Sequence, residues 1–501
     1  MSRQKAEVKG SAYLEALPLR PGWNNSQGLR RRPLPGSAAA REEMTAIPPQ
    51  GPDSTRRPLL VIAAIALGLR LAWIFSADVD VTSGFYFDMT WYHGMGQRIA
   101  EGMGLTRLTG APTAEWPPGY PLALGIIFKL TGDSVRAAQL FGALCAAAAC
   151  ALIYLLGKRL AGQSVGLVAA CLLALSPGDI FYAPLLLAEV PFTATLVAAC
   201  VFFLKVDQQA GEGLPSASGC IGVGIILGAA TLVRGASILF FLVFAAIWLL
   251  RGIGFASTLR STALVCLGLV LTLVPWTVRN QLRMGEPIVL STSLGRTLSH
   301  AHSPVEVGGR SLDELRYRMD FWKRYEHIPQ PRREIEINRA FTQDALKQIL
   351  EHPFDEIAFV PRRLVNFFRH DHAALEWGRP HVTPGAVSGP RRPLFDSIPD
   401  SAFAAVADGY FHLVLIAAAV GVAAIVRGRE PRSLLIPLAI AYFTLLHITA
   451  FPGEPRYRHP AGPFILIAAA WAFVSAGRTY GHRHNVQDEQ DEQGANGERL
   501  Q

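Results

Sequence analysis

Long apolar stretches spaced along the chain constrain its fold more than any other feature. Ten of them lie at about 58–76, 136–156, 163–182, 190–204, 219–233, 236–250, 262–278, 403–426, 434–450 and 459–476. A helix needs roughly 20 apolar residues to cross the hydrocarbon of a bilayer, and most of these stretches approach that length. Half of the 501 residues are hydrophobic, which is typical of a membrane protein. We therefore expect an all-α polytopic membrane protein with about ten (nine to twelve) transmembrane helices.

The distribution of basic residues predicts the orientation of the spans. Segment 117–131 is also apolar, and counting it as a span would place Lys158, Arg159 and Arg251 outside. Treating it as a re-entrant or interfacial helix places the basic residues that flank the spans on one side, in agreement with the positive-inside rule. These residues are Arg56, Arg57, Lys158, Arg159, Lys205, Arg251, Arg260, Arg427, Arg429, Arg432 and Arg478. We therefore predict a multi-pass protein of the inner or plasma membrane with both termini in the cytoplasm.

The rest of the chain divides into two tails and two external segments. The N-terminal tail is rich in Arg, Pro, Gly and Ser and has no apolar periodicity, so it is predicted to be disordered. Charged and apolar residues alternate at helical spacing in 313–327 and 333–368, which predicts amphipathic helices over the membrane face. The predicted organisation is a disordered cytoplasmic tail at 1–56, a transmembrane catalytic module at 57–278 with an external loop at 77–135, an external helical segment at 279–402, C-terminal transmembrane helices at 403–477 and a disordered cytoplasmic tail at 478–501.

Net charge and cysteine usage argue against several classes of function. The formal net charge of +8 is explained by arginines at helix ends, so we predict no nucleic-acid partner. The six cysteines lie in apolar stretches without a CxxC motif, which argues against a disulfide framework or a thiolate metal site. His370-Asp371-His372 is the best histidine candidate for a metal. A surface sequence of this kind is usually only polar, so no metal-ligating residue is predicted.

The loop after the first span carries the most unusual sequence of the chain, from Phe87 to Pro121. Asp88 lies among aromatic residues, and Glu115 begins a Glu-Trp-Pro-Pro-Gly-Tyr-Pro run. An enzyme at a membrane surface needs a fixed carboxylate to accept a proton and a rigid apolar wall beside it. A simple connection between two helices needs neither, so this loop is the first candidate for a catalytic site.

Charged residues from distant parts of the chain converge on the external face under the predicted topology. They are Asp88, Glu115, Glu189, Arg234, Arg279, Arg456 and Arg458. Such a cluster suits transfer from an anionic lipid-phosphate donor, because arginines hold phosphate and a carboxylate deprotonates the incoming hydroxyl. Taken singly, each residue has a structural alternative. Asp88 fits a helix cap, Glu189 an acid that complements a helix dipole, and Arg234 a side chain that reaches the interface.

Several motifs, in this order and topology, resemble those of a known family. They are FDMTWYHGMGQRIAEGMGL, EWPPGYPLALGIIFKLTG, LLGKRLAGQSVGLVAACLLALSPGDIFYAPLLLAEVPFTATL, the stretch with PWTVRN and STSLGRTL, and FPGEPRYRHPAGP. Over roughly 58–476 the chain resembles the GT-C glycosyltransferases. Within them it is most similar to bacterial relatives of the dolichyl-phosphate-mannose protein mannosyltransferases (glycosyltransferase family 39) and to the aminoarabinose transferases that act on lipid A. The resemblance implies a GT-C fold.

The resemblance also implies roles for individual residues. Asp88 corresponds to the catalytic base of the first external loop. Glu189 corresponds to a second acid that positions the acceptor or assists the donor site. Arg234, Arg456 and Arg458 correspond to arginines that grip the donor phosphate.

Two departures from the family pattern leave the acceptor open. Eukaryotic members that glycosylate proteins carry an acidic pair in the first loop, whereas Phe87-Asp88-Met89 offers one acid. They also carry sugar-binding-like inserts, and none is evident in 279–402. Glu115 matches a position that is usually polar or charged. The acceptor is therefore a lipid, a glycan or a protein.

We interpret the chain as a membrane glycosyltransferase that moves a hexosyl or pentosyl group from a polyprenyl-phosphate donor to an acceptor hydroxyl. Transfer is predicted at the external, periplasmic face, with inversion, with Asp88 as general base and with Arg279 among the substrate-binding arginines. One alternative is a polytopic transporter, which would show inverted repeats and charges near the midplane. The other is a glycan polymerase or ligase that uses a pyrophosphate-linked donor. No cofactor is required; the acidic groups would permit a divalent cation without demanding one.

Overall fold

The protein is helical throughout the residues that its structure, a computed structural model, describes. The described residues are 56–77, 79, 81, 87–302, 319–377 and 398–477. The helices are α2 (Arg56–Ser76), α3 (Phe87–Ala100), α4 (Gly119–Thr131), α5 (Val135–Ala161), α6 (Gln163–Leu175), α7 (Pro177–Phe181), α8 (Glu189–Gln209), α9 (Ala217–Val233), the 3₁₀ turn η1 (Gly235–Ser237), α10 (Phe241–Leu250), α11 (Phe255–Met284), α12 (Leu294–Ala301), α14 (Arg332–Glu351), α15 (Pro353–Phe367), α16 (Ala373–Trp377), α17 (Asp400–Gly428), α18 (Leu435–Thr449) and the 3₁₀ turn η2 (Pro455–Ala461). A last helical segment, Pro455–Gly477, includes η2. The predicted tails lie outside the described residues, apart from Arg56.

The expected fold class, an all-α polytopic membrane protein, is confirmed. Among the described residues, six helices are long and apolar enough to cross a membrane: α2, α5, α8, α11, α17 and Pro455–Gly477. Five shorter apolar helices accompany them: α4, α6, α9, η1 with α10, and α18. Each of the ten expected spans coincides with one of these helices, and α4 corresponds to segment 117–131. The exact number of spans and the interfacial position of α4 stay predictions.

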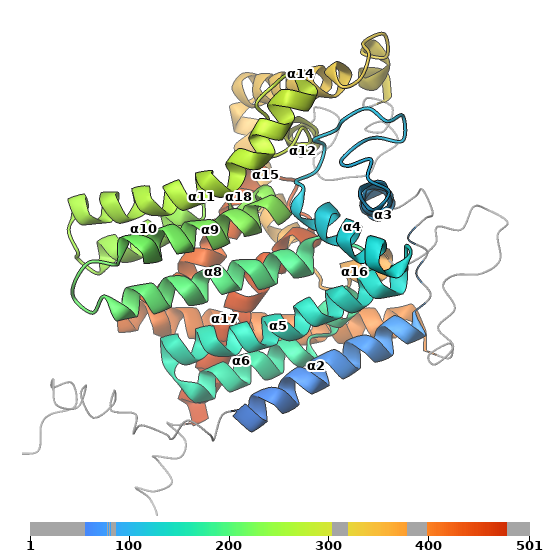
Figure 1. The fold of residues 1–501 in the computed structure, drawn as a ribbon. Helices are drawn as coiled ribbons and strands as arrows, with labels where there is room; N and C mark the ends of the chain where they lie inside the picture. The colour runs from blue at the N-terminus through green and yellow to red at the C-terminus, as the bar shows by residue number, and fades with distance from the viewer. Residues whose placement is uncertain are drawn as a thin grey trace, which may run out of the picture. The chain divides into compact units, whose positions relative to one another are not determined.

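The connections between the bundle helices gather at two ends. At one end, Arg136 near the start of α5 donates a hydrogen bond to the Ile74 carbonyl near the end of α2. At the other, Arg159 near the end of α5 donates to Gln208 near the end of α8, at 2.8 Å. We call the first the loop end, because α3 and α4 lie there in Figure 1, and the second the turn end. Every charged residue predicted for the site lies in the loops or helix termini of the loop end.

Small residues let the bundle helices approach closely. A Cβ atom on Gly224 of α9 would lie 2.0 Å from the Val265 carbonyl oxygen of α11, and one on Gly268 of α11 would lie 2.1 Å from the Ile221 carbonyl oxygen of α9. Helix packing within a bilayer depends on such backbone contact, because lipid supplies no hydrophobic drive between apolar helices. The paired glycines therefore fix α9, and with it Arg234 at its end, against α11.

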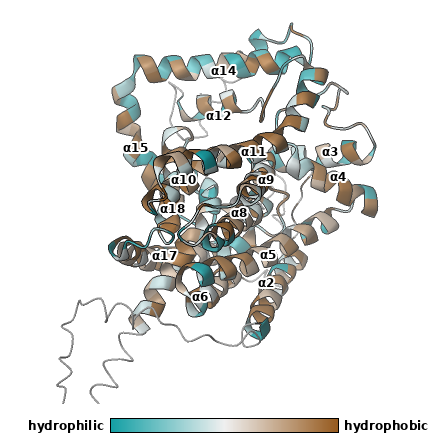
Figure 2. Ribbon diagram, turned by 60° about the vertical axis from the view of Figure 1, so that its left-hand side comes forward, coloured by the Kyte–Doolittle hydropathy of each residue, from teal (hydrophilic) through white to brown (hydrophobic). Residues whose placement is uncertain are grey.

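The predicted external helical segment contains α12, α14 and α15, which confirms amphipathic helices over 333–368. In α14, Ile337, Phe341 and Ala345 are buried, whereas Figure 2 shows hydrophilic residues on much of the rest of the helix. The buried Arg363 guanidinium of α15 donates to the Ala301 carbonyl of α12 at 2.6 Å and pairs with Glu356 at 2.9 Å. Of the other predicted helix, 313–327, only residues from 319 onward are described.

The predicted loop at 77–135 is largely helical, with α3 and α4 packed together around a turn. The Glu-Trp-Pro-Pro-Gly-Tyr-Pro run leads into α4 at Gly119. A Cβ atom there would lie 2.8 Å from the Leu232 carbonyl oxygen of α9, so only glycine permits this approach. The run is thus a close docking point between the first external loop and the bundle.

Candidate active site at the loop end

Two carboxylate–arginine pairs lie at the loop end. Asp88, in the first turn of α3, pairs with Arg456 of η2, with 2.8 Å between Oδ2 and Nη1. Glu189, the first residue of α8, pairs with Arg234 at the end of α9, with 2.7 Å between Oε1 and Nη1. Both acids also occupy first turns, where a helix dipole favours negative charge. Both acids therefore lie at helix starts and also form ion pairs; the capping alternative for Asp88 stays a prediction.

Tyr457 lies between the two arginines. The Arg234 guanidinium stands 5.2 Å and the Arg456 guanidinium 4.9 Å from the centre of the Tyr457 ring. Arg456 also donates a hydrogen bond of 3.2 Å to the Tyr457 hydroxyl. An aromatic face attracts each cation and keeps two like charges at separate positions. The Tyr457 ring therefore holds the two guanidinium groups near one another, while each pairs with a different acid.

Tyr92 completes this arrangement from α3, one helical turn after Asp88. Its side chain is buried and packs edge-on against Tyr120, with ring centres 4.9 Å apart. Burial raises the pKa of the Tyr92 hydroxyl, the charges of Asp88 and Glu189 raise it further, and Arg234 and Arg456 oppose them. All four charged groups therefore act on one phenol, which stays neutral. Sequence analysis missed Tyr92, although its i+4 spacing from Asp88 places both on one helix face.

Glu454 is a second acid that sequence analysis did not single out. Its carboxylate lies 3.5 Å from Nε of Arg456 and 3.3 Å from Nε2 of His300 in α12. It therefore links the turn before η2 to the external helical segment. The sequence analysis also did not single out Asp78 and Asp80, which form an Asp-Val-Asp sequence. Both lie outside the described residues.

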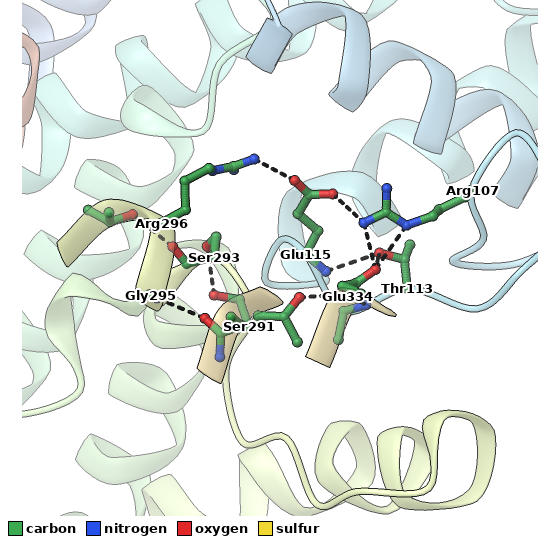
Figure 3. A network of polar contacts seen from close by, with 12 residues as sticks. Arg107, Thr113, Glu115, Ser291, Ser293, Gly295, Arg296 and Glu334 are labelled. Carbon is green, nitrogen blue, oxygen red and sulfur yellow. Dashed lines mark hydrogen bonds and ion pairs between the residues drawn. The ribbon is translucent and has the colours of Figure 1, made fainter. Parts of the chain in front are cut away.

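Glu115 belongs to a separate polar network, shown in Figure 3. Its carboxylate pairs with Arg107 at 2.8 Å and with Arg296 of α12 at 2.6 Å. Arg107 also pairs with Glu334 of α14 at 2.8 Å, and the Ala114 backbone N–H donates to Glu334 at 2.9 Å. Buried carboxylates need several donors to offset the loss of water, and these two have them. The network fastens the first external loop to α12 and α14.

Arg279, predicted to bind substrate, contacts backbone instead. Its guanidinium donates to the Thr113 carbonyl at 2.8 Å and to the Leu105 carbonyl, and stands 5.1 Å from the Trp276 ring centre. These contacts hold the turn between α3 and α4. The substrate-binding role of Arg279 stays a prediction that none of these contacts supports.

Arg458 lines a cavity between α7, α17 and the last helical segment. It pairs with Asp371 at 2.6 Å, donates to the His370 carbonyl at 2.9 Å, and stands 3.8 Å from the Phe411 ring centre. Burial raises the pKa of Asp371 to about 6, against the lowering effect of Arg458. Arg458 thus contacts a different set of groups from Arg456, which is two residues earlier.

The lining of this cavity also contains a carboxylate–imidazole pair. Asp179 of α7 lies 3.0 Å from Nε2 of His459, and Nδ1 of His459 lies 2.9 Å from the Thr193 hydroxyl of α8. Val414, Ile465 and Leu466 add apolar side chains to the lining. The cavity is therefore lined by both charged and apolar groups.

The comparisons with known proteins follow this geometry. Residues 115–278 match the family described as dolichyl-phosphate-mannose-protein mannosyltransferase. Over these residues the chain is similar to that glycosyltransferase family. The match agrees with the resemblance drawn from the sequence. It contains Glu115, Glu189 and Arg234, whereas Asp88 and the late arginines lie beyond its limits.

Two solved structures align with most of this chain. One is the archaeal oligosaccharyltransferase AglB from Archaeoglobus fulgidus in complex with an inhibitory peptide and a dolichol-phosphate, at 15% identity and a TM-score of 0.49, covering 86% of this chain and 51% of that one. The other is ArnT from Cupriavidus metallidurans bound to undecaprenyl phosphate, at 16% identity and a TM-score of 0.40, covering 80% and 77%. This chain spans about half the length of the archaeal enzyme. No curated protein matches the sequence.

Proposed function

We propose that this protein transfers a sugar from a polyprenyl-phosphate donor to an acceptor hydroxyl at the external face of the membrane. The acceptor oxygen attacks the anomeric carbon as the bond from that carbon to the phosphate oxygen breaks, with inversion. The hydroxyl proton passes to the Asp88 carboxylate, and polyprenyl phosphate leaves with the bonding electron pair. A positioned carboxylate of this kind contributes roughly 10²–10⁴-fold to rate.

The observation that carries this proposal is the pairing of Asp88 with Arg456 beside the pairing of Glu189 with Arg234. Without substrate, each arginine holds its carboxylate in place through an ion pair. A donor phosphodiester carries one negative charge, as a carboxylate does, and accepts a guanidinium fork in the same way, so it competes for Arg456 and Arg234. When Arg456 moves to the phosphate, Asp88 is released to accept a proton. Donor binding thereby switches on the base.

Charge development explains why the two arginines serve catalysis as well as binding. Negative charge grows on the phosphate oxygen as its bond to the sugar breaks, so an arginine held beside it stabilises the transition state more than the ground state. Tyr457 limits the movement of both guanidinium groups. In this scheme Glu189 orients Arg234, and Glu115 acts on the acceptor side by fixing the loop that follows Tyr92.

The family match supports a monophosphate donor, because the family name specifies dolichyl-phosphate-mannose. The cavity that Arg458 lines has charged groups that suit a headgroup and apolar side chains that suit the first prenyl units. Arg159, Arg251 and Arg432, which the positive-inside rule assigns to the cytoplasm, lie at the turn end, and this supports cytoplasmic termini and an external site. The sugar and the acceptor, whether lipid, glycan or protein, stay open.

The two alternative functions, a transporter and a glycan polymerase or ligase, require other features than those of the proposed site. A secondary transporter places charged groups near the midplane of broken helices. In α8 the acidic residues lie instead near its two ends, at Glu189 and Asp207. A polymerase or ligase would use a pyrophosphate-linked donor, and supplying mono- and pyrophosphate donors separately discriminates it.

Sugar transfer by membranes that carry the wild type or Asp88→Asn tests the proposal, with radiolabelled polyprenyl-phosphate sugars and total envelope acceptors. Glu101→Gln is the matched control, because Glu101 is an exposed acid that directly follows α3. We expect transfer by wild type and Glu101→Gln, and its loss in Asp88→Asn at an equal protein level. Equal transfer by Asp88→Asn would remove the base role. A wild type that accepts only pyrophosphate donors would favour the ligase.

A further inference from the structure

Two histidines and an aspartate converge between α15 and α17, away from the two ion pairs of the proposed site. Residues His370 and His372 lie in the short connection between α15 and α16, and Asp408 lies on α17. One ligand atom from each residue lies within 4.8 Å of the others. We propose that these three residues bind a divalent transition-metal ion of the zinc class.

The local geometry places both histidines on one side of the connection. Their rings stack with centres 4.2 Å apart and planes 19° apart. Asp371, between them, sends its side chain the other way, to Arg458 at 2.6 Å. An i, i+2 pair in a non-helical stretch points to one side while the residue between points to the other. The sequence His-Asp-His thus supplies two ligands to one site and a separate anchor to another.

Outer contacts hold the ligands in position, as they do at metal sites. Oδ1 of Asp408 accepts a hydrogen bond of 2.8 Å from the Asp371 backbone N–H, which leaves Oδ2 directed at the His372 ring, 2.8 Å from its Nδ1. Arg458 fixes the same connection through the His370 carbonyl. Partners of this kind set the orientation of a ligating carboxylate and are worth roughly 10–100-fold in metal affinity.

A hydrogen bond between His372 and Asp408 would by itself join the connection to α17. Such a hydrogen bond would not require the imidazole of His370 within the same 4.8 Å, nor the second hydrogen bond that orients the Asp408 carboxylate. The presence of His370 and the hydrogen bonds that orient Asp408 and the connection therefore favour a bound ion over a simple hydrogen bond between His372 and Asp408.

The donor set selects the class of ion. Imidazole nitrogen suits zinc, cobalt, nickel and copper, whereas magnesium and calcium prefer oxygen ligands throughout. Three protein ligands leave the fourth tetrahedral position open for water or an anionic oxygen. Because His370 and Asp371 also line the cavity that Arg458 lines, the ion would fix one wall of that cavity to α17. This inference does not rest on the proposed sugar transfer.

Binding of Co²⁺ and Zn²⁺ to the purified full chain in detergent tests the site. Co²⁺ in a site with imidazole and carboxylate ligands gives visible absorption, and Zn²⁺ retained after desalting is counted by mass spectrometry. We expect binding by the wild type, and a loss in Asp408→Asn and His370→Ala greater than the roughly 10–100-fold that removal of an outer partner costs. Asp408→Asn keeps an oxygen for the Asp371 N–H, which favours folding of this variant.

His352→Ala is the matched control. His352 is exposed and lies 3.7 Å from Asp355, and among the described residues it belongs to no group of three possible metal ligands. It should bind both ions like the wild type. Absence of cobalt absorption and retained zinc in the wild type would overturn the proposal, and so would equal binding by Asp408→Asn. If both ligand variants fail to fold, the spectrum of the wild type alone decides, since octahedral water ligation absorbs far more weakly. Metal content is measured without sugar transfer, so the two proposals fail separately.

Discussion

Buried acids stand at both ends of the helix bundle, and they are held in different ways. At the turn end, Asp207 has no exposed surface and accepts hydrogen bonds from Trp248 at 2.9 Å, from Arg432 at 2.7 Å and from Arg251. At the loop end, the side chain of Asp88 is 16% exposed and Arg456 is the partner of its ion pair. Three donors enclose the first acid, whereas the second is partly exposed beside Arg456.

This difference separates a structural ion cluster from a candidate reactive one. A fully enclosed cluster has no room for substrate, and removing one member leaves buried charge without a partner. A partly exposed pair costs less to open, and its arginine can exchange the carboxylate for an arriving anion. The same residue types therefore serve assembly at the turn end and, in our proposal, chemistry at the loop end.

The largest expected effect is loss of transfer in Asp88→Asn. Asparagine keeps the shape and removes the proton acceptor, so transfer should fall by roughly 10²–10⁴-fold. Protein level and thermal unfolding should stay near those of the wild type. If Asp88→Asn unfolds instead, Asp88 has a structural role like that of Asp207, and the proposed difference between the two ends of the bundle is wrong.

Asp207→Ala should act in the opposite sense. It leaves Arg251 and Arg432 near the bundle end without their acid, at a cost of about 3–5 kcal/mol in the free energy of unfolding. We expect poor accumulation in the membrane and a lower midpoint in thermal unfolding. The specific activity of the protein that does fold should be close to normal, and a selective loss of transfer would contradict the structural role.

Glu334→Gln should have an intermediate effect confined to the first external loop. Glutamine still accepts a hydrogen bond but loses the charge that faces Arg107, and a hydrogen bond to a charged group contributes about 1.5–3 kcal/mol. Hydrogen exchange should rise in residues 101–118 and in α14, with the bundle unchanged. Unaltered exchange in that loop would show that the network does not fasten it.

The smallest effect is expected from Gly119→Ala. The new methyl group would lie 2.8 Å from the Leu232 carbonyl oxygen, so α4 must move away from α9 at a cost of about 1–3 kcal/mol. Thermal unfolding of Gly119→Ala beside Gly409→Ala measures it. Gly409 of α17 has no neighbouring atom within 4 Å of an added Cβ, so alanine there should be neutral or slightly stabilising.

Sequence reasoning was most successful where the determining signal is local. Apolar stretches predicted the helices of the bundle, and alternating charge predicted α14 and α15, because hydropathy and helical period are read within one segment. It also selected Asp88, Glu189, Arg234 and Arg456, which the structure brings together as two pairs. Their functional roles remain proposals.

The sequence did not show which residues these acids and arginines pair with. Arg456 is 368 residues from Asp88, and nothing in either motif names the other. Arg279 lies next to the same face, yet its guanidinium turns to backbone carbonyls. Tyr92, Glu334 and Glu454 look like ordinary helix or turn residues until their neighbours are known.

The sequence by itself determined a helical membrane protein with charged loops gathered at one end, because the bilayer requires apolar spans and each span reverses the direction of the chain. Only the tertiary structure decided which acid meets which base and which acids are enclosed by several donors. Those outcomes depend on side-chain directions and on close backbone contacts such as that at Gly119 and Leu232, which are set once the helices are packed.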